Sequence, residues 1–285
     1  MAPEIGIMQG RLLPMLDDRY QGFPGGRWQK EFALAKQAKL SCIEWVYDDD
    51  TENINPIGSE SGIEEISRLV DSTGVEVRSL CGNYFMVNRL VGWDGTLNKD
   101  AITKFNWLVK TAKEIGVVYI VLPLLEESTL STTAEIEGVI TMVDSLLPSL
   151  ELTGIELLLE TDLSAEKIKT VLEEVNHSLI GINYDIGNSA SIGYKPVDEL
   201  RTLSHWVRGV HVKDRVYQGG TVPLGCGDAD FGTSFRMLLA NGFDRWFVLE
   251  AARRKDISEF MAAEVNRKFV EDHLNLLSRE KTIYS

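Results

Sequence analysis

Four short apolar runs in the second half of the chain each end in a residue that can bind a metal ion or transfer a proton. These runs are LLLE ending at Glu160, INYD ending at Asp185, GVHVKD containing His211, and FVLE ending at Glu250. If they converge, three carboxylates and one imidazole make a mostly oxygen site for one divalent cation. Mn²⁺ suits this ligand set best, and Mg²⁺, Co²⁺ and Zn²⁺ are alternatives. Without a cation the three carboxylates would repel one another, and at least one would take up a proton.

A single acidic residue at the end of a strand is more often a helix cap or part of a surface salt bridge. Four such ends in consecutive strands favour a shared site. The remaining histidines, His177, His205 and His273, lie on predicted helices or at their edges. We interpret them as solvated or capping residues.

The elements that would position the four residues alternate between strand-like and helical patterns. β-branched and apolar runs predict eight strands, beginning near Glu4, Cys42, Val75, Val117, Ile155, Ile180, Val207 and Arg245. Helical periodicity is clearest at residues 101–115, 136–150 and 258–277. Eight βα units predict a closed parallel (β/α)₈ TIM barrel with α/β architecture, formed as one domain over residues 1–285. A doubly wound open sheet is the alternative fold.

In such a barrel, the functional groups lie at the C-terminal ends of the strands. The period-two alternation of a strand places Trp246 and Val248 on the same side as Glu250. By the same rule, Lys213 shares the side of His211. The segment from Asp214 to Asp230 is long for a barrel loop and rich in glycine, so it is either a lid that closes over substrate or a floppy surface excursion.

Composition excludes several classes of partner. The chain has 29 Lys and Arg against 43 Asp and Glu, a formal net charge of -14, which disfavours nucleic acid and anionic membranes. The 3 cysteines include no CxxC pair, as expected for free thiols in a reducing compartment. Residues 1–18 lack a signal-peptide pattern, because Arg11, Pro14, Asp17 and Asp18 interrupt it. We therefore expect a cytoplasmic protein.

Taken together, the motifs resemble the xylose isomerase-like TIM barrels, a family of sugar phosphate isomerases and epimerases that includes ketose 3-epimerases. The resemblance covers the whole chain, and its most specific segments are GIMQGRL, NYDIGNSASIG, VHVKDR, PLGCGDADF and VLE. By position, it implies that Glu160, Asp185, His211 and Glu250 bind the metal. It also implies that Glu160 and Glu250 transfer protons, and that Asn188 contacts substrate.

The expected substrate is a monosaccharide or its phosphate. Four further residues are candidates for binding this substrate by their location alone: Lys213, Arg215, Arg253 and Arg254. Glu44, at the end of the second strand, could also bind a substrate hydroxyl, but a salt bridge is an equally good interpretation of it. Trp45, Trp93, Trp107 and Tyr84 are candidates for the pocket wall, although Trp107 lies on an apolar helical stripe. Cys226 is interpreted as a small loop residue.

Endonuclease IV is a more distant relative that uses extra histidines at the third and fourth strands. The corresponding segments here, at residues 80–83 and 122–124, contain none, which argues against DNA repair.

A metal bound to the oxygens of a carbonyl and a neighbouring hydroxyl would stabilise an enediolate while two glutamates move the proton. The pattern leaves open whether the outcome is epimerisation or aldose–ketose isomerisation. Two rival hypotheses are a lyase that dehydrates a cyclic polyol and a non-catalytic binding module. Barrels of this type often form homodimers, but no segment marks an interface.

Overall fold

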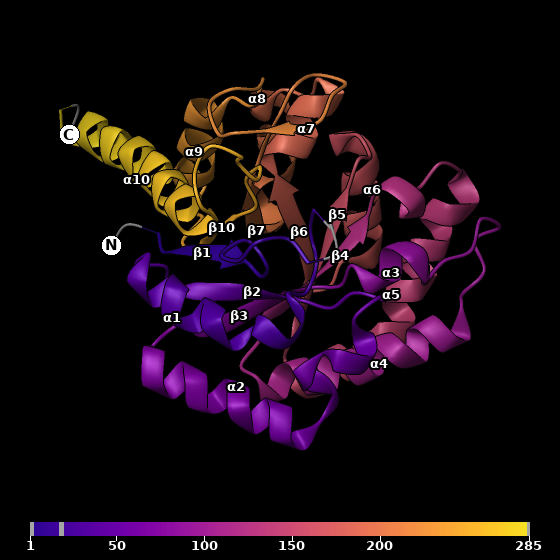
Figure 1. Cartoon of the computed structure of the whole chain (residues 1–285). Coiled ribbons are helices and arrows are strands. Elements are labelled where there is room, and N and C mark those ends of the chain that lie inside the picture. Colours follow the sequence, from indigo (N-terminus) through magenta and orange to yellow (C-terminus); the bar gives the residue numbers. More distant parts are fainter. Residues whose placement is uncertain (1–2, 17–19, 284–285) are drawn as a thin grey trace.

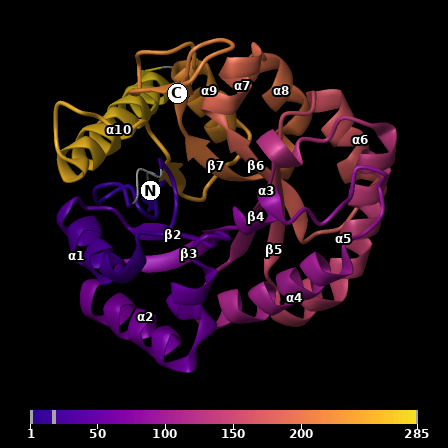
Figure 2. The same cartoon turned by 45° about the vertical axis from the view of Figure 1, so that its right-hand side comes forward.

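Eight parallel strands close into a barrel with helices around its outside (Figures 1 and 2). The computed structural model describes residues 3–16 and 20–283, with side chains described as far as residue 279. Around the barrel the strands follow the order β1-β10-β7-β6-β5-β4-β3-β2. Their bounds are β1 Ile5–Met8, β2 Cys42–Val46, β3 Glu76–Cys81, β4 Tyr119–Leu124, β5 Glu156–Thr161, β6 Ile180–Asp185, β7 Val207–Val212 and β10 Phe247–Leu249. The fold is therefore the predicted single-domain (β/α)₈ barrel, and the open-sheet alternative is wrong.

The helices cover the outer face of the barrel. They are α1 Gln29–Gln37, α2 Glu60–Thr73, α3 Tyr84–Val87, α4 Lys99–Glu114, α5 Thr133–Thr153, α6 Ala165–Val175, α7 Ile186–Ile192, α8 Pro196–Leu203, α9 Phe231–Ala240 and α10 Glu259–Ile283. Short 3₁₀ turns occupy Gly25–Arg27, Glu52–Ile54, Pro56–Gly58, Glu126–Ser128 and Ser204–Trp206. Across the described residues, none of these helices is long and apolar enough to cross a membrane. Of the N-terminal residues considered above, Asp17 and Asp18 lie outside the described residues.

Local sequence explains where the helices begin and end. At the start of α5, Thr132 and Glu135 form a reciprocal capping box, and the Asn98 side chain accepts from the first amides of α4. Gly74 and Gly154 end α2 and α5 in the left-handed conformation that glycine adopts without strain. Ser164 precedes α6 as predicted, but its side chain makes no capping hydrogen bond.

Strand alternation divides the core into two layers. The main apolar layer lies between strands and helices and includes Val210, Val212, Phe247 and Leu249. A smaller buried cluster fills the barrel interior and includes Met8, Cys42, Val46, Cys81, Tyr119, Val121, Leu158, Trp246 and Val248. The rings of Tyr119 and Trp246 stack with centroids 5.2 Å apart near the starts of their strands. This packing fills the N-terminal end of the barrel, so its polar residues gather toward the other end.

The glycine-rich segment after β7, residues 214–230, has regular structure. This finding argues against its interpretation as a floppy surface excursion. The segment contains a two-stranded antiparallel hairpin, β8 Asp214–Arg215 and β9 Thr221–Val222. The fully buried Asp214 carboxylate accepts hydrogen bonds from the backbone N–H groups of Gly225, Gly227 and Ala229, at 2.8, 2.9 and 3.2 Å. One side chain thus ties the far end of the loop to the end of β7.

Candidate functional site

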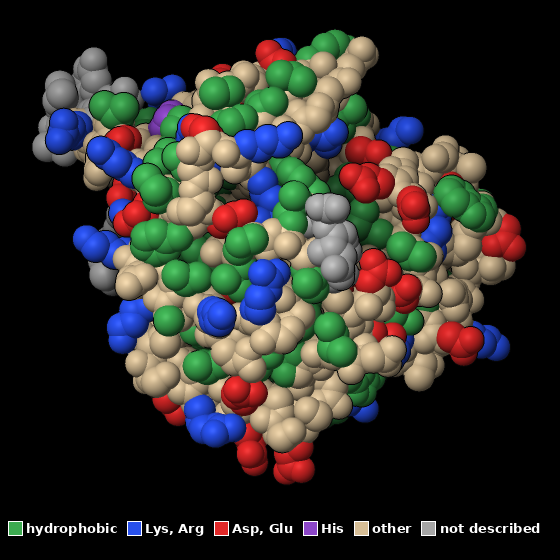
Figure 3. Space-filling view, in the orientation of Figure 1, with side chains coloured by type: hydrophobic (Ala, Val, Ile, Leu, Met, Phe, Trp, Pro, Cys, Tyr) green, Lys and Arg blue, Asp and Glu red, His purple; other side chains and the backbone are tan. Residues whose placement is uncertain are grey.

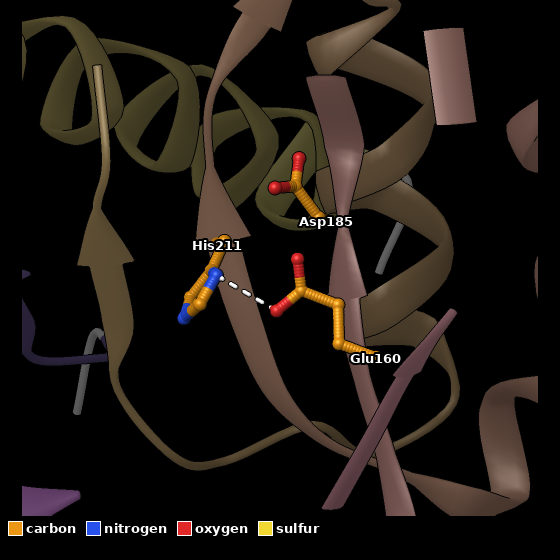
Figure 4. A group of neighbouring side chains, drawn as sticks. All are labelled: Glu160, Asp185 and His211. Carbon is orange, nitrogen blue, oxygen red and sulfur yellow. Dashed lines mark ion pairs between the residues drawn. The ribbon is translucent and has the colours of Figure 1, made fainter. Parts of the chain in front are cut away.

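Three of the four strand-end residues meet inside the barrel. One ligand atom from each of Glu160, Asp185 and His211 lies within 4.8 Å of the other two, and all three residues are buried. Figure 4 shows their side chains pointing toward one another from neighbouring strands. His211 Nδ1 lies 3.3 Å from Glu160 Oε2, the pair joined by the dashed line.

Strand register explains this convergence. Asp185, the last residue of β6, pairs directly with His211 on β7, and His211 pairs on its other side with Val248 of β10. Glu160 lies near the end of β5, the next strand beyond β6. Because the strands are parallel, their C-terminal ends reach the same rim, and alternation turns these side chains inward.

Glu250 joins the group from the opposite side. It follows β10, is buried, and places Oε2 at 3.0 Å from His211 Nδ1. His211 Nδ1 is thus flanked by Glu160 and Glu250. The structure brings together all four residues that the sequence singled out, while their roles as ligands and bases stay predictions.

Glu44 contacts the ring nitrogen of His211 that the other three acidic residues leave free. Its Oε1 is 2.7 Å from His211 Nε2, and both side chains are almost fully buried. Of the two interpretations of Glu44, the structure therefore supports the salt bridge, which here is made to the imidazole ring of His211. Burial lowers the pKa of His211, but Glu44 and Glu160 outweigh it and raise that pKa well above its ordinary value.

Two amides hold Glu160. Asn183 Nδ2 donates to Oε2 at 2.9 Å, and Asn188 Nδ2 donates to Oε1 at 3.0 Å. Arg215 Nη1 donates to Asn188 Oδ1 at 3.0 Å, while its Nε and Nη2 donate to the Gly219 carbonyl. Arg215 therefore acts on the site through Asn188 instead of offering a free guanidinium to substrate. Sequence analysis missed Asn183, although it stands two residues before Asp185 and so shares its face of β6.

Cations surround Glu250. Lys213 Nζ lies 2.6 Å from Glu250 Oε1 and 3.0 Å from Asp185 Oδ2. Arg11 Nη2 lies 3.8 Å from Glu250 Oε1. Burial works against the charged form, yet Lys213 and His211 hold the pKa of Glu250 well below its ordinary value. Burial raises the pKa of Asp185 to about 6 although Lys213 opposes the shift. Sequence analysis did not name Arg11 as a site residue, although it stands just after the first strand and within the segment GIMQGRL.

The guanidinium groups of the two other candidate arginines contact groups outside the four-residue cluster. The guanidinium of Arg253 donates hydrogen bonds to three backbone carbonyls. Nε donates to that of Tyr20 at 2.9 Å, Nη1 to that of Leu13 at 2.8 Å and Nη2 to that of Gly10 at 2.7 Å. These contacts give Arg253 a structural role between the loops after β10 and β1, and its expected contact with substrate stays a prediction. Arg254 pairs with the exposed Asp256.

Most of the candidate wall aromatics lie elsewhere. Trp45 is fully buried in the layer that faces the helices, where its Nε1 donates to Asn55, so it is not a wall residue. Trp107 packs against the same layer as predicted. Trp93 is exposed and lies against the Arg89 guanidinium, whose carbon is 3.7 Å from the ring centroid. Cys226 is an exposed loop thiol.

A cavity of about 360 Å³ lies apart from the strand-end cluster. It is bounded by α7, the start of α8 and the loop before α9, and it is lined in part by Tyr194, Lys195, Asp198, Asp228 and Asp230. None of the four clustered residues lines this cavity, so we do not place the chemistry there.

The chemistry of the donors fits a divalent cation. Asp185 Oδ2 and His211 Nδ1 are buried, and within the part of the chain that the structure describes their polar contacts are the ion pairs to Lys213, Glu160 and Glu250 given above, with no further hydrogen bond. Ligands about 2.1 Å from a small divalent cation stand roughly 3 Å apart at right angles, which is close to the His211–Glu160 and His211–Glu250 separations. Glu160, Asp185, His211 and Glu250 would hold the ion, giving three oxygen ligands and one nitrogen ligand.

Comparison with known proteins places the chain in a family. A sequence model of the xylose isomerase-like TIM barrel matches residues 32–273. The chain belongs to this family. Among solved structures, that of an L-ribulose 3-epimerase superposes with a TM-score of 0.76 at 16% identity, covering 99% of this chain and 98% of that one. A structure of the IOLI protein with a bound zinc atom gives a TM-score of 0.76 at 15% identity, covering 96% and 99%. At these identities the two structures support the shared barrel alone.

One curated relative is an inosose dehydratase from Clostridium botulinum (strain Alaska E43 / Type E3). It is 21% identical over 132 residues, which are 40% of this chain and 44% of that protein. The match thus spans less than half of the relative's length. An epimerase is thus among the solved structures that share this fold, and a dehydratase is among the curated proteins with partial sequence similarity to this chain.

Proposed function

We propose that this protein is a divalent-metal-dependent isomerase or epimerase that acts on a monosaccharide or sugar phosphate. The observation that carries the proposal is the pair Glu160 and Glu250, whose oxygens lie 3.3 and 3.0 Å from His211 Nδ1 and approach it from different sides of the barrel. A proton next to a carbonyl is too weakly acidic for a lone carboxylate, so the reaction needs two positioned bases and an electrophile. A divalent cation in this cluster would act as a Lewis acid and stabilise negative charge on substrate oxygens.

The two glutamates are held by different partners. Glu160 accepts from two neutral amides, whereas Glu250 is held by the Lys213 ammonium and by His211. In the proposed reaction one glutamate removes a proton from the carbon beside the carbonyl. Return of a proton by the other glutamate to the opposite face inverts the centre, and return to the neighbouring carbon exchanges aldose and ketose.

The test is proton exchange with solvent. Ketoses and ketose phosphates are screened with the Mn²⁺-supplemented full chain in deuterated water, and deuterium incorporation is read by NMR. We expect Glu160→Gln and Glu250→Gln each to lower incorporation about 100-fold or more, the scale of a lost general acid or base. Glu166→Gln, which changes an exposed glutamate at the start of α6, is the matched control and should exchange at the wild-type rate. Retained exchange in both site variants contradicts the two-base assignment.

A second candidate is a lyase that removes water from a cyclic polyol, and the match to the inosose dehydratase favours it. The same glutamates would take a proton from carbon and deliver one to a departing hydroxyl. Mass spectrometry separates the two functions, because the lyase product has lost one water whereas epimerisation and isomerisation conserve mass.

A further inference from the structure

Lys213 is a cation built into the proposed ligand cluster. It follows β7, and its Nζ bridges Asp185 Oδ2 on β6 and Glu250 Oε1 beyond β10, at 3.0 and 2.6 Å. Since β6 and β10 flank β7 on either side, the ammonium joins carboxylates from both neighbouring strands. Its side chain is only 12% exposed.

The surrounding chain is shaped to hold this lysine. Gly187, in the first turn of α7, packs so closely that a Cβ there would lie 2.8 Å from the backbone carbon and from Cγ of Lys213. Any larger residue at this position would push the lysine stem away. The position of the ammonium is therefore set by packing on its stem as well as by its ion pairs.

The charges explain why a cation is needed at this point. Glu44, Glu160, Asp185 and Glu250 are all buried around His211, and a buried carboxylate without a counter-charge is strongly destabilising. Lys213 supplies positive charge to two of the four, on oxygens that a metal ion would also use. Two cations in contact with the same buried oxygens repel each other, and this repulsion is little screened inside a protein.

We propose that Lys213 competes with the divalent metal for Asp185 and Glu250, an inference that rests on the proposed function. The lysine keeps these carboxylates paired, and metal binding has to displace its ammonium from at least one of them. Lys213 therefore weakens metal binding while it stabilises the ligand cluster.

The test is Mn²⁺ binding to the full-length chain after treatment with a chelator, measured by isothermal titration calorimetry. Lys213→Met removes the charge and adds a thioether, for which Mn²⁺ has little preference. We expect it to bind Mn²⁺ about tenfold more tightly than wild type or better, since repulsion between the cations is relieved. We also expect its melting temperature without added metal to fall. Lys213→Arg keeps the charge and should retain weak binding.

The matched control is Lys169→Met. Lys169 pairs with Glu173 at 3.7 Å on the surface of α6, so its loss should change neither Mn²⁺ affinity nor the melting temperature measurably. Equal or weaker Mn²⁺ binding by Lys213→Met, with clear binding by wild type, overturns the competition alone. Absence of Mn²⁺ binding from wild type and variants alike overturns the metal site and both proposals with it.

A crystal structure of the Mn²⁺-soaked wild-type chain tests the same point without any variant. We expect Nζ of Lys213 to have left Asp185 Oδ2 or Glu250 Oε1. A structure with Mn²⁺ bound and both contacts intact overturns the proposal.

Discussion

His211 and Glu44 make a buried contact in which Nε2 and Oε1 are 2.7 Å apart. With Nε2 committed to Glu44, the other ring nitrogen faces Glu160 and Glu250. A histidine that binds metal through one nitrogen commonly donates the other N–H to a carboxylate, which fixes the tautomer and the ring orientation. Glu44 is thus positioned to decide which nitrogen of His211 is offered to a metal ion.

We therefore predict that Glu44→Met weakens Mn²⁺ binding by about 10- to 100-fold, the usual effect of losing such a partner. Glu44→Gln should weaken it less, because its amide oxygen still accepts from Nε2. Calorimetry on both variants measures the difference, and circular dichroism checks that they fold. Equal affinity in the two variants and wild type would show that Glu44 does not position the ring.

Strand patterns were enough to predict the barrel and the polar rim. Apolar runs located all eight barrel strands because each is buried on both faces, and the residues at their ends point to one rim by geometry alone. The convergence of Glu160, Asp185 and His211 follows from strand order and register, both of which a closed parallel barrel fixes.

Long side chains and loops were harder to predict, because their partners are distant in sequence. Arg253 donates to the carbonyl of Gly10, 243 residues away, across the seam where β10 closes on β1. Glu44 and His211 meet across the barrel interior, 167 residues apart. In the loop after β7, the buried Asp214 carboxylate accepts three backbone N–H groups, and strand periodicity does not distinguish such a residue from a solvated loop acid.

Arg253 should matter for stability more than for substrate binding. Its guanidinium joins the loop after β10 to carbonyls of Gly10, Leu13 and Tyr20 in the loop after β1. We predict that Arg253→Met lowers the free energy of unfolding by about 2–4 kcal/mol, because it leaves partly buried carbonyls without their charged donor. Urea titration measures this change. Arg254→Met, which removes an exposed ion pair with Asp256, should cost far less. Similar losses in the two variants would contradict the assignment.

Asp214 should control the order of the segment after β7. Its carboxylate accepts three backbone N–H groups, and an asparagine would turn an NH₂ group toward at least one of these donors. We predict that Asp214→Asn speeds hydrogen exchange at Gly225, Gly227 and Ala229 and costs about 1–3 kcal/mol of stability. Asp256→Asn, at an exposed position, is the control. Unchanged exchange at the three amides would mean that the loop is held by other contacts.

Glu31 gives the fold a pH dependence that a single substitution should remove. This buried residue of α1 accepts from the backbone N–H groups of Gly10 and Leu12, at 2.7 and 3.4 Å, and burial raises its pKa from 4.5 to about 8. Between these two values the folded chain binds more protons than the unfolded chain. The contribution of Glu31 to stability is therefore complete below the lower value and is lost as pH rises toward the upper one.

We predict that Glu31→Gln, which resembles the protonated carboxyl, is close to wild type in stability at about pH 5 and becomes relatively more stable as pH rises to about 8. Melting temperatures of both proteins across this range, without added metal, measure the difference. Glu166→Gln serves as the exposed control and should follow wild type throughout, because this side chain is exposed to solvent at the start of α6. A constant gap between Glu31→Gln and wild type at every pH would mean that Glu31 is already ionised in the folded chain at the acidic end, with Arg253 and Arg27 as its counter-charges.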